Sequence, residues 1–415
     1  MKVMHNMTHE ETAPAPRMFV IGASIATLIS IAAWLLAPIE ARFISSLTDN
    51  PTLVGVTYAV GAVAYSILAL ILGRVADRVG REKMIIMGLV VGVIYPILYA
   101  SAINVFTYMG IELLWALAAV GTGPILYAFL QDLIHEHPNR GHLMSLMWGA
   151  MSLSGAVGHL TGGFVASSFG LTGPYYVVSG IFFLILLGSL PVFLKSARQA
   201  PCVQRTEQED HGLDTSSVWF GMRYVFTKPA LVYYFIVNSA VAICYRVKLL
   251  VWPLIVVLFI EDPAVMGIIF AGTGVTAFFV LMFSGKFIDR YGPYPGVTLA
   301  FVAFFVGGFL MAFTGSYWWF GVGAALFAVG EAFWGSAQSL LLIDNVASQH
   351  RAEVLGVDMI FDSSFTTAGM LGAGALMAVW SAQEVWLVLM LVLLVAYILA
   401  TIYKMLRIPQ SLQRP

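Results

Sequence analysis

The stretch GRVADRVGREK, residues 73 to 83, decides the fold because a shortened copy of it, GKFIDRYG, recurs at residues 285 to 292. The first glycines of the two copies, Gly73 and Gly285, are 212 positions apart. A nearly identical offset of 211 joins three pairs further along each half: Arg140 and Arg351, Gly158 and Gly369, and Gly163 and Gly374. One offset that holds across several segments indicates that the chain contains a duplicated unit.

Composition places both copies in a membrane protein. Of the 415 residues, 60% are hydrophobic and only 10% are charged, whereas soluble domains are roughly 45–50% apolar and about 25% charged. A hydrocarbon core about 30 Å thick needs about 20 apolar residues per helix, because backbone polar groups in lipid must be satisfied within the segment. The chain therefore has no room for a sizeable soluble domain, and we expect an all-α membrane protein.

Twelve apolar segments have the length that a membrane span needs. The first six cover residues 18–42, 53–72, 84–103, 108–131, 143–166 and 173–194, and the last six cover 230–259, 264–284, 293–314, 317–342, 353–379 and 385–403. We therefore expect five parts: an N-terminal tail (1–17), a six-helix bundle (18–195), a cytoplasmic linker (196–229), a second six-helix bundle (230–407) and a C-terminal tail (408–415).

The positions of the cations orient these helices, since cytoplasmic loops carry an excess of Lys and Arg. If the N-terminus is inside, eighteen of the 21 Lys and Arg residues fall on the cytoplasmic side. This predicts a multi-pass protein of the cell membrane with both termini in the cytoplasm. Three cations break the rule: Arg42 near the outer end of the first helix, and Arg246 and Lys248 in AICYRVKLLVWP (242–253).

The repeated loop resembles the loop between the second and third helices of the major facilitator superfamily. That family has Gly-x-x-x-Asp-Arg-x-Gly-Arg followed by Lys or Arg, which Gly73, Asp77, Arg78, Gly80 and Arg81 match. The resemblance covers nearly the whole chain and implies a monomeric transporter of two six-helix bundles, with alternating access and no cofactor. It also implies that Asp77 holds the outward-facing state by contacting the eleventh helix.

Conformational gating is accordingly assigned to this loop, its copy and two residues expected beside it. The set comprises Gly73, Asp77, Arg78, Gly80, Arg81, Asp132, Arg140, Gly285, Asp289, Arg290 and Gly292.

A second resemblance is to the drug/proton antiporters. GAVGHLTGG (155–163) is similar to their glycine-rich signature on the fifth helix, but His159 stands in place of a proline. Glycines at this spacing let helices pack closely, which is also the simpler explanation of the pattern. On the fourth helix Trp115 replaces an arginine that the family uses in proton coupling. The antiporter type is therefore the closest match, and it departs at two positions.

Ionisable side chains at membrane depth mark ion or substrate pathways and usually face the interior. Arg246 and Lys248 lie near the middle of the seventh helix, Glu331 lies on the tenth, and Asp358 and Asp362 share a face of the eleventh. They either form structural ion pairs or serve transport. Residues two apart on a helix point in nearly opposite directions, so only one of the two cations is expected in the cavity.

The functional interpretation divides these residues into two sets. We expect substrate contacts from Arg246, Lys248, Glu331, Trp334, Gln338, Tyr245, Asn238 and Trp252, and proton coupling from Glu331, Asp362, Asp358 and His159. A hydrogen-bonded packing role is the simpler explanation for His159. Interfacial solvation is the simpler explanation for Glu112, Glu40 and Arg42. No metal site is expected, because proline and glycine in HEHPNRGH (135–142) break any shared face.

The function predicted from the sequence is proton-coupled efflux of a small organic solute, anionic or zwitterionic. Proton-coupled uptake of an organic anion and lipid translocation are the alternatives within transport. A membrane receptor or assembly factor that has lost transport is the alternative from another class. The chain shows no paired nucleophile and base, so an enzyme is not expected. The expected partners are protons, membrane lipids and the solute, and not nucleic acid.

Overall fold

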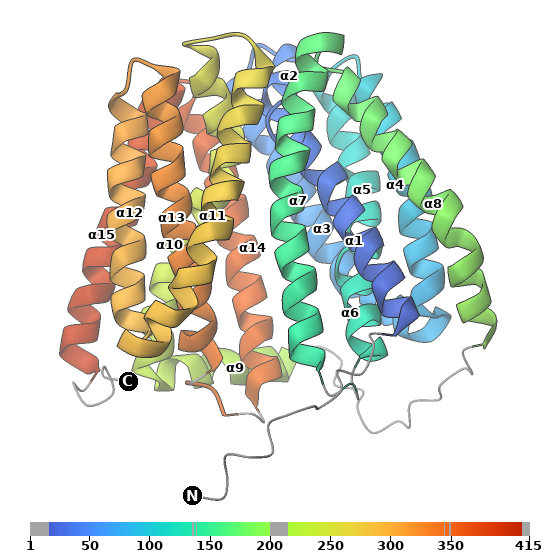
Figure 1. The fold of residues 1–415 in the computed structure, drawn as a ribbon. Coiled ribbons are helices and arrows are strands. Elements are labelled where there is room, and N and C mark those ends of the chain that lie inside the picture. Colours follow the sequence, from blue (N-terminus) through green and yellow to red (C-terminus); the bar gives the residue numbers. More distant parts are fainter. Residues whose placement is uncertain are drawn as a thin grey trace, which may run out of the picture.

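A computed structural model describes residues 16–134, 137, 139–199, 215–343, 345–347 and 350–408, and these are almost entirely helical. The long helices run side by side and form two groups (Figure 1). The first half holds α1 (Arg17–Leu36), α2 (Glu40–Ser46), α3 (Pro51–Val79), α4 (Arg81–Ala100), α5 (Val105–Thr122), α6 (Pro124–Leu133), α7 (Arg140–Phe169) and α8 (Gly173–Gln199). The start of α1 and the end of α15 lie at one end of the molecule, and α2 lies at the other. We call these the terminal end and the α2 end.

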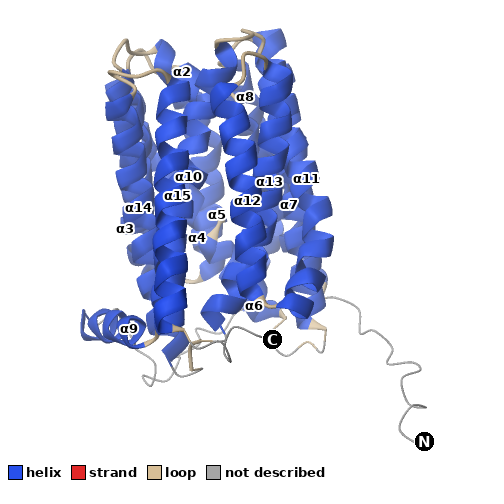
Figure 2. Cartoon of the chain, turned by 90° about the vertical axis from the view of Figure 1, so that its left-hand side faces the viewer, coloured by secondary structure: helices blue, strands red, loops and turns tan. Residues whose placement is uncertain are grey.

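The second half begins with a helix inside the stretch that was expected to be a linker. This half comprises α9 (Thr215–Thr227), α10 (Pro229–Val257), α11 (Pro263–Tyr291), α12 (Pro293–Phe313), α13 (Tyr317–Ile343), α14 (Arg351–Leu376) and α15 (Ala382–Arg407). Helix α9 lies across the terminal end, roughly perpendicular to the others (Figure 2). Gly221 lets it approach α14, because a Cβ there would lie 2.8 Å from the carbonyl oxygen of Glu353.

Two of the expected helices are interrupted, each at a proline. The segment expected at 18–42 is split into α1 and α2 around Pro38, and the segment expected at 108–131 is split into α5 and α6 between Gly123 and Pro124. Proline has no N–H to donate and its ring clashes with the preceding turn, so the helix ends before it. The first break sets α2 as a separate short helix at one end of the bundle.

Among the described residues, ten segments are long and apolar enough to cross a membrane, with α5 and α6 counted as one. Helices α7 and α14 are as long as their neighbours but less apolar. The first is rich in Gly and Ser, and the second carries Asp358 and Asp362. Both lie centrally, where the halves meet (Figure 1). The count of twelve spans therefore remains a prediction, with α7 and α14 as the two additional helices.

The two halves meet through two equivalent helix pairs, α7 with α11 and α3 with α14. A Cβ on Gly163 of α7 would lie 2.8 Å from the Cα of Gly267 on α11, and a Cβ on Gly55 of α3 would lie 2.7 Å from the Cα of Gly374 on α14. Gly55 and Gly267 are 212 positions apart, and Gly163 and Gly374 are 211 apart. The duplication seen in the sequence is thus a pair of equivalent contacts in three dimensions.

Both glycine contacts lie at the α2 end, because they fall early in α3 and α11 and late in α7 and α14. A third link crosses the halves there, where Arg42 Nη1 of α2 donates a hydrogen bond to the carbonyl oxygen of Glu261 (2.7 Å). At the terminal end, a Cβ on Gly73 or Gly285 would meet no described atom within 4 Å. The halves are therefore packed together at the α2 end and less closely at the terminal end.

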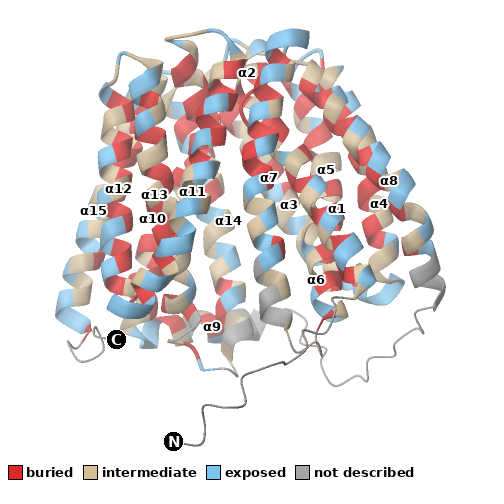
Figure 3. Cartoon of the chain, viewed as in Figure 1, coloured by how far each residue is buried: buried red, intermediate tan, exposed pale blue. Residues whose placement is uncertain are grey.

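Burial follows the helix faces that meet one another. Buried residues line the inner faces of the helices, and exposed residues cover the outward faces (Figure 3). Outward-facing Leu, Ile, Val and Phe side chains suit lipid, which is as apolar as they are. Helix α10 is the most enclosed of the candidate spans. A charge on α10 is therefore either buried within the protein or directed between the halves.

Candidate functional site

Helix α10 directs its two central cations into different surroundings. Lys248 is 7% exposed, whereas Arg246 is exposed. The helical repeat of 3.6 residues per turn separates side chains two positions apart by about 200°, so the same stretch of helix serves two environments. The sequence predicted that only one of the two faces the cavity, and that assignment stays a prediction.

Lys248 is held in a compact charged cluster within the second half. Its Nζ forms an ion pair with Glu331 Oε1 of α13. The ammonium also lies 4.4 Å from the ring centroid of Tyr245 and 5.5 Å from that of Trp252. Carboxylate and aromatic faces both stabilise a cation, and more strongly away from water. Lys248 is thus neutralised by residues of its own half.

Arg246 faces the other half instead. It is near enough to Tyr65 of α3 and Asp362 of α14 to act electrostatically on both side chains. Helices α3 and α14 form one of the two contacts between the halves. Arg246 therefore lies where the halves meet, near the middle of α10, with one carboxylate and one phenol around it.

Asp358 lies in a third polar group, one turn of α14 closer to the terminal end. Tyr234 Oη and Asn238 Nδ2 of α10 both donate to Asp358 Oδ1, at 3.0 and 3.1 Å. Trp334 is buried and stacks on Tyr234 with 6.1 Å between ring centroids. Asn238 and Trp334 therefore support Asp358 in this structure.

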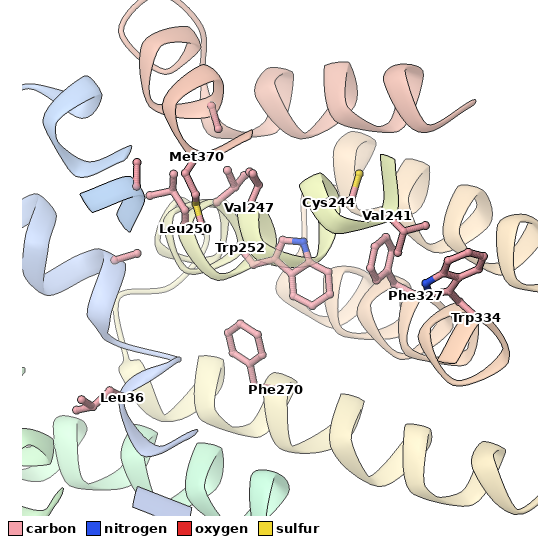
Figure 4. Close-up of a cluster of buried hydrophobic side chains, with 14 of the residues drawn as sticks. Leu36, Val241, Cys244, Val247, Leu250, Trp252, Phe270, Phe327, Trp334 and Met370 are labelled. Atoms are coloured by element: carbon pink, nitrogen blue, oxygen red, sulfur yellow. The ribbon is translucent and has the colours of Figure 1, made fainter. Parts of the chain in front are cut away.

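Trp252 is enclosed by the aromatic core of the second half. It is 1% exposed, and its ring packs on Phe270, Phe327 and Trp386. Figure 4 shows its indole directed from α10 toward Phe270 of α11. Its described contacts are therefore core contacts and the Lys248 ammonium.

A small pocket lies beside Glu331. It is lined by Val241, Cys244, Tyr245, Phe304, Phe327, Glu331 and Leu393. Tyr245 is one of these lining residues and is exposed. Gln338, two turns along α13 from Glu331, is half-buried. Of the expected aromatic and amide contacts, Tyr245 and Gln338 are thus more accessible than Trp252, Trp334 and Asn238.

A family model for the Major Facilitator Superfamily matches residues 22–261 and 242–414. The chain belongs to the Major Facilitator Superfamily. Members of this family are membrane transporters and not enzymes, and the described part of this chain has several helices long and apolar enough to cross a membrane. The resemblance read from GRVADRVGREK is confirmed.

Solved structures support the same fold. The nucleoside transporter NupG superposes with a TM-score of 0.75 at 14% identity, covering 94% of this chain and 99% of that one. A bacterial homologue of the human lysosomal transporter Spinster, in an inward-facing and unoccupied conformation, gives 0.72 at 14% identity, covering 93% and 96%.

Curated relatives match over one part of their length. The chain is 25% identical to multidrug resistance protein 2 of Bacillus subtilis over 179 residues, which is 43% of this chain and 44% of that protein. It is 29% identical to sugar efflux transporter A of Dickeya chrysanthemi over 177 residues, or 40% and 45%. The multidrug resistance protein MdtG of Escherichia coli gives 25% over 189 residues, or 43% and 45%. The chain thus aligns with less than half of each relative, and these include the drug-efflux type expected from the sequence.

The loop that carries the superfamily signature is held within its own half. Arg81 bonds to Asp132 of α6 at 2.6 Å and lies 3.4 Å from Asp77, whose side chain is 56% exposed. Asp289 and Arg290 of the second copy are also exposed. The Arg140 side chain lies outside the described part of the chain. Asp132 therefore joins the loop as expected, and the described ionic partner of Asp77 is Arg81.

This arrangement makes a modest prediction for the superfamily loop. Asp132→Asn removes the shorter of two carboxylate contacts to Arg81, a pair with much of its surface in solvent. Such pairs contribute about 1 kcal/mol or less. We expect a small decrease in melting temperature of the purified protein, and a decrease as large as that of a core truncation would contradict this weak role. Asp289→Asn is the control, because Asp289 is exposed and has no described ion pair.

The helix α7 signature has two distinct contact faces. Gly158 packs on α1, where a Cβ would lie 2.5 Å from the carbonyl oxygen of Ile31, and Gly163 packs across the halves on Gly267. His159 lies between them, edge-on to Trp34 of the first half and stacked on Phe270 of the second, with centroid separations of 5.2 and 5.1 Å. The close packing expected of these glycines is confirmed, and His159 is part of the contact between halves.

The expectation that Glu112 is solvated is wrong. Glu112 is 4% exposed and lies among tyrosines near the α2 end of the first half. Glu40, at the start of α2, lies in the same group. The signals of this group in the sequence are the spacing of four between Tyr108 and Glu112, which places both on one face of a helix, and Pro38, which separates α2 from α1. The partners come from five different helices, which periodicity alone does not bring together.

Proposed function

We propose that the protein is a proton-coupled exporter of a small organic solute with an anionic or zwitterionic group. One observation carries this proposal: Arg246 is exposed between the halves, while the other central cation is neutralised by Glu331. A guanidinium in that position can bind a carboxylate or phosphate with two parallel hydrogen bonds. Export is favoured because the multidrug resistance and sugar efflux relatives are named for it.

The proposal includes an orientation and a mechanism. We place the terminal end in the cytoplasm, with twelve spans in two bundles (18–195 and 230–407) that rock about the central charges. The packed α2 end and the looser terminal end fit a state closed to the outside. Sites at the interface between repeats near the midplane are usual for transporters built from duplicated units.

Proton coupling is assigned first to Glu331 and then to Asp362. Each carboxylate faces one central cation, Lys248 or Arg246. A proton on either carboxylate removes the counter-charge of the cation that this carboxylate faces. Asp358 and His159 are further candidates, because Asp358 accepts two hydrogen bonds and His159 joins the halves.

A second candidate is proton symport of an organic anion, and the ion pair itself favours it. When Glu331 takes up a proton, Lys248 loses its partner and becomes free for an anionic solute. Each ligand then strengthens the binding of the other, as thermodynamic linkage requires. An exporter that works by antiport needs coupling of the opposite sign, in which the binding of a proton weakens the binding of the solute.

Binding measured against pH separates these two candidates. For antiport, acidification weakens solute binding to the purified protein. For symport, acidification strengthens it. The change approaches about tenfold per pH unit when one proton is linked to one solute. A solute affinity that does not vary with pH, together with transport unaffected by a proton gradient, contradicts proton coupling of either kind.

The substrate role of Arg246 is tested by substitution. Arg246→Ala removes a charge-assisted contact of about 1.5–3 kcal/mol, so we expect affinity for an anionic solute to fall roughly 10- to 150-fold. Arg246→Lys keeps the charge and should retain part of the affinity. Lys286→Ala, which removes an exposed cation of α11, is the matched control. Equal affinities for Arg246→Ala and Lys286→Ala contradict the role. Binding is measured by calorimetry or a thermal-shift screen against organic anions and cations.

A further inference from the structure

The first half contains two neighbouring acidic side chains, and neither forms an ion pair with a described residue. Glu112 of α5 and Glu40 of α2 are close enough to interact electrostatically. Tyr108 Oη donates to Glu40 Oε1 at 3.0 Å and lies 3.3 Å from Tyr175 Oη. The group lies at the α2 end of the first half, apart from Arg246 and Lys248 on α10.

The walls of this group are made of tyrosines from four helices. The titratable groups that face the two carboxylates are Tyr58 of α3, Tyr95 and Tyr99 of α4, Tyr108 of α5 and Tyr175 of α8. No described Lys, Arg or His forms an ion pair with either carboxylate. Burying an ionised carboxylate without a counter-charge is unfavourable, and two such charges side by side are worse. The described surroundings therefore favour a protonated carboxyl group here.

A tyrosine hydroxyl lies beside the interior carboxyl group. Tyr99 is 1% exposed, and its hydroxyl lies close to the Glu112 carboxyl group. Its ring is fixed by stacking on Tyr108, with 4.0 Å between centroids. Buried polar groups are normally hydrogen-bonded. The Tyr99 hydroxyl can donate to an ionised Glu112 or accept from its protonated form, so it can serve the carboxyl group in both states.

The two carboxylates differ in their access to solvent. Glu40 is partly exposed at the start of α2, whereas Glu112 is buried against Gly61 of α3. Tyr108 lies beside Glu40, and hydroxyl groups both accept and donate protons. Glu40 therefore provides the entry from the α2 end, and Glu112 provides the interior position.

The same short helix links this group to the second half. Two residues after Glu40, Arg42 donates to the carbonyl oxygen of Glu261 at 2.7 Å and lies near the Glu261 and Asp262 carboxylates. Helix α2 also packs on α10. A shift of α2 caused by repulsion between Glu40 and Glu112 would act directly on this link.

We propose that Glu40 and Glu112 form a proton-binding site in the first half, separate from the central charges, whose occupancy holds the α2 end closed. The site deepens the proton coupling proposed above and rests on it only for its role in transport. Protonation removes the repulsion and keeps α2 against α10. Loss of the proton leaves two neighbouring negative charges, whose repulsion drives α2 away and opens this end.

The test measures opening at the α2 end in purified protein without any solute. Spin labels are placed at Asp49 in the first half and Gly315 in the second, both exposed loop positions at this end. Cys202 is replaced by Ser, and Cys244 is buried and will not label. Distances between the labels are recorded from about pH 5 to about pH 9, the range in which buried carboxyl groups titrate.

We expect the open fraction to increase several-fold with pH in the parent protein. In Glu112→Gln and Glu40→Gln the amide mimics the protonated acid, so the open fraction should stay at its low-pH value throughout. Glu384→Gln, which changes an exposed carboxylate of α15 outside this site, should keep the pH response. A response that persists unchanged in the double variant Glu40→Gln/Glu112→Gln overturns the proposal. Monodisperse gel filtration and an unchanged helical circular dichroism spectrum show that each variant is folded.

Two further experiments separate a proton site from a metal-cation site, and the site itself from the proposed function. Exchanging sodium for choline at fixed pH should leave the distances unchanged, and a sodium-dependent shift would overturn a proton site in favour of a metal cation. Transport in proteoliposomes with and without a proton gradient tests the proposed function separately. Transport that ignores the gradient while the pH response depends on Glu112 contradicts proton coupling and retains the site. Gradient-driven transport with a pH response independent of Glu40 and Glu112 retains proton coupling and contradicts the site.

Discussion

Lys248→Met is expected to destabilise the protein by about 3 kcal/mol or more, because it leaves Glu331 inside the second half without its cation. The side chains of Lys248 and Glu331 are 8% and 17% exposed, so water does not replace the lost partner. Methionine is similar in length to lysine, so little packing is lost. The measurement is the melting temperature of the purified protein, followed by tryptophan fluorescence.

The double variant Lys248→Met/Glu331→Leu decides whether the charge is responsible. Replacing both members of a buried pair by apolar residues is often neutral or stabilising, so the double variant should regain most of the stability lost in the single one. A double variant as unstable as the single variant contradicts this account. The double variant also separates folding from function. If it is stable and no longer responds to a proton gradient, Glu331 serves coupling and not only packing.

Gly267→Ala is expected to have the second large effect, by preventing the α2 end from closing. The added Cβ would lie 2.7 Å from the carbonyl oxygen of His159 and 2.8 Å from the Cα of Gly163, both backbone atoms that cannot rotate away. Overpacking of this kind costs about 1–3 kcal/mol, which corresponds to roughly a 5- to 150-fold loss of the closed population. Labels at Asp49 and Gly315 would report a longer distance.

Two comparisons make the prediction specific. Gly55→Ala should have a similar effect, because its Cβ would lie 2.7 Å from the Cα of Gly374 in the equivalent contact. Gly272→Ala on the same helix as Gly267 should leave the distance unchanged, since its Cβ would meet no described atom within 4 Å. Equal behaviour of Gly267→Ala and Gly272→Ala would show that the close glycine contact does not control closure.

The two halves use their buried charges differently. In the second half a cation and a carboxylate neutralise each other, and Arg246 stays exposed beside the first half. In the first half Glu40 and Glu112 have tyrosine hydroxyls in place of a cation. The duplicated framework has thus kept equivalent glycine contacts at 211 and 212 residues while its polar groups have diverged.

The sequence by itself determined the membrane class, the duplicated framework and the family. The length and hydrophobicity of a span are local properties of the sequence. The motifs around Asp77 and Asp289 are local as well, because each lies within a short segment. The alternate directions of Arg246 and Lys248 were also predictable, because they follow from the helical repeat. The breaks at Pro38 and Pro124 were visible as prolines, but the chain on each side is apolar enough to be read as one span.

Only the tertiary structure decided which charges meet. Lys248 and Glu331 are 83 positions apart, and Glu40 and Glu112 are 72 apart, so no local pattern links them. Trp252 and Trp334 were expected to contact substrate, and the structure gives them core contacts. The sequence does not distinguish the two positions, because an apolar helix has aromatic residues both on a cavity face and in a core. Glu112 was expected to be solvated because its depth was judged along one helix. Its burial depends on four other helices that close around it, and that arrangement exists only once the bundle has packed.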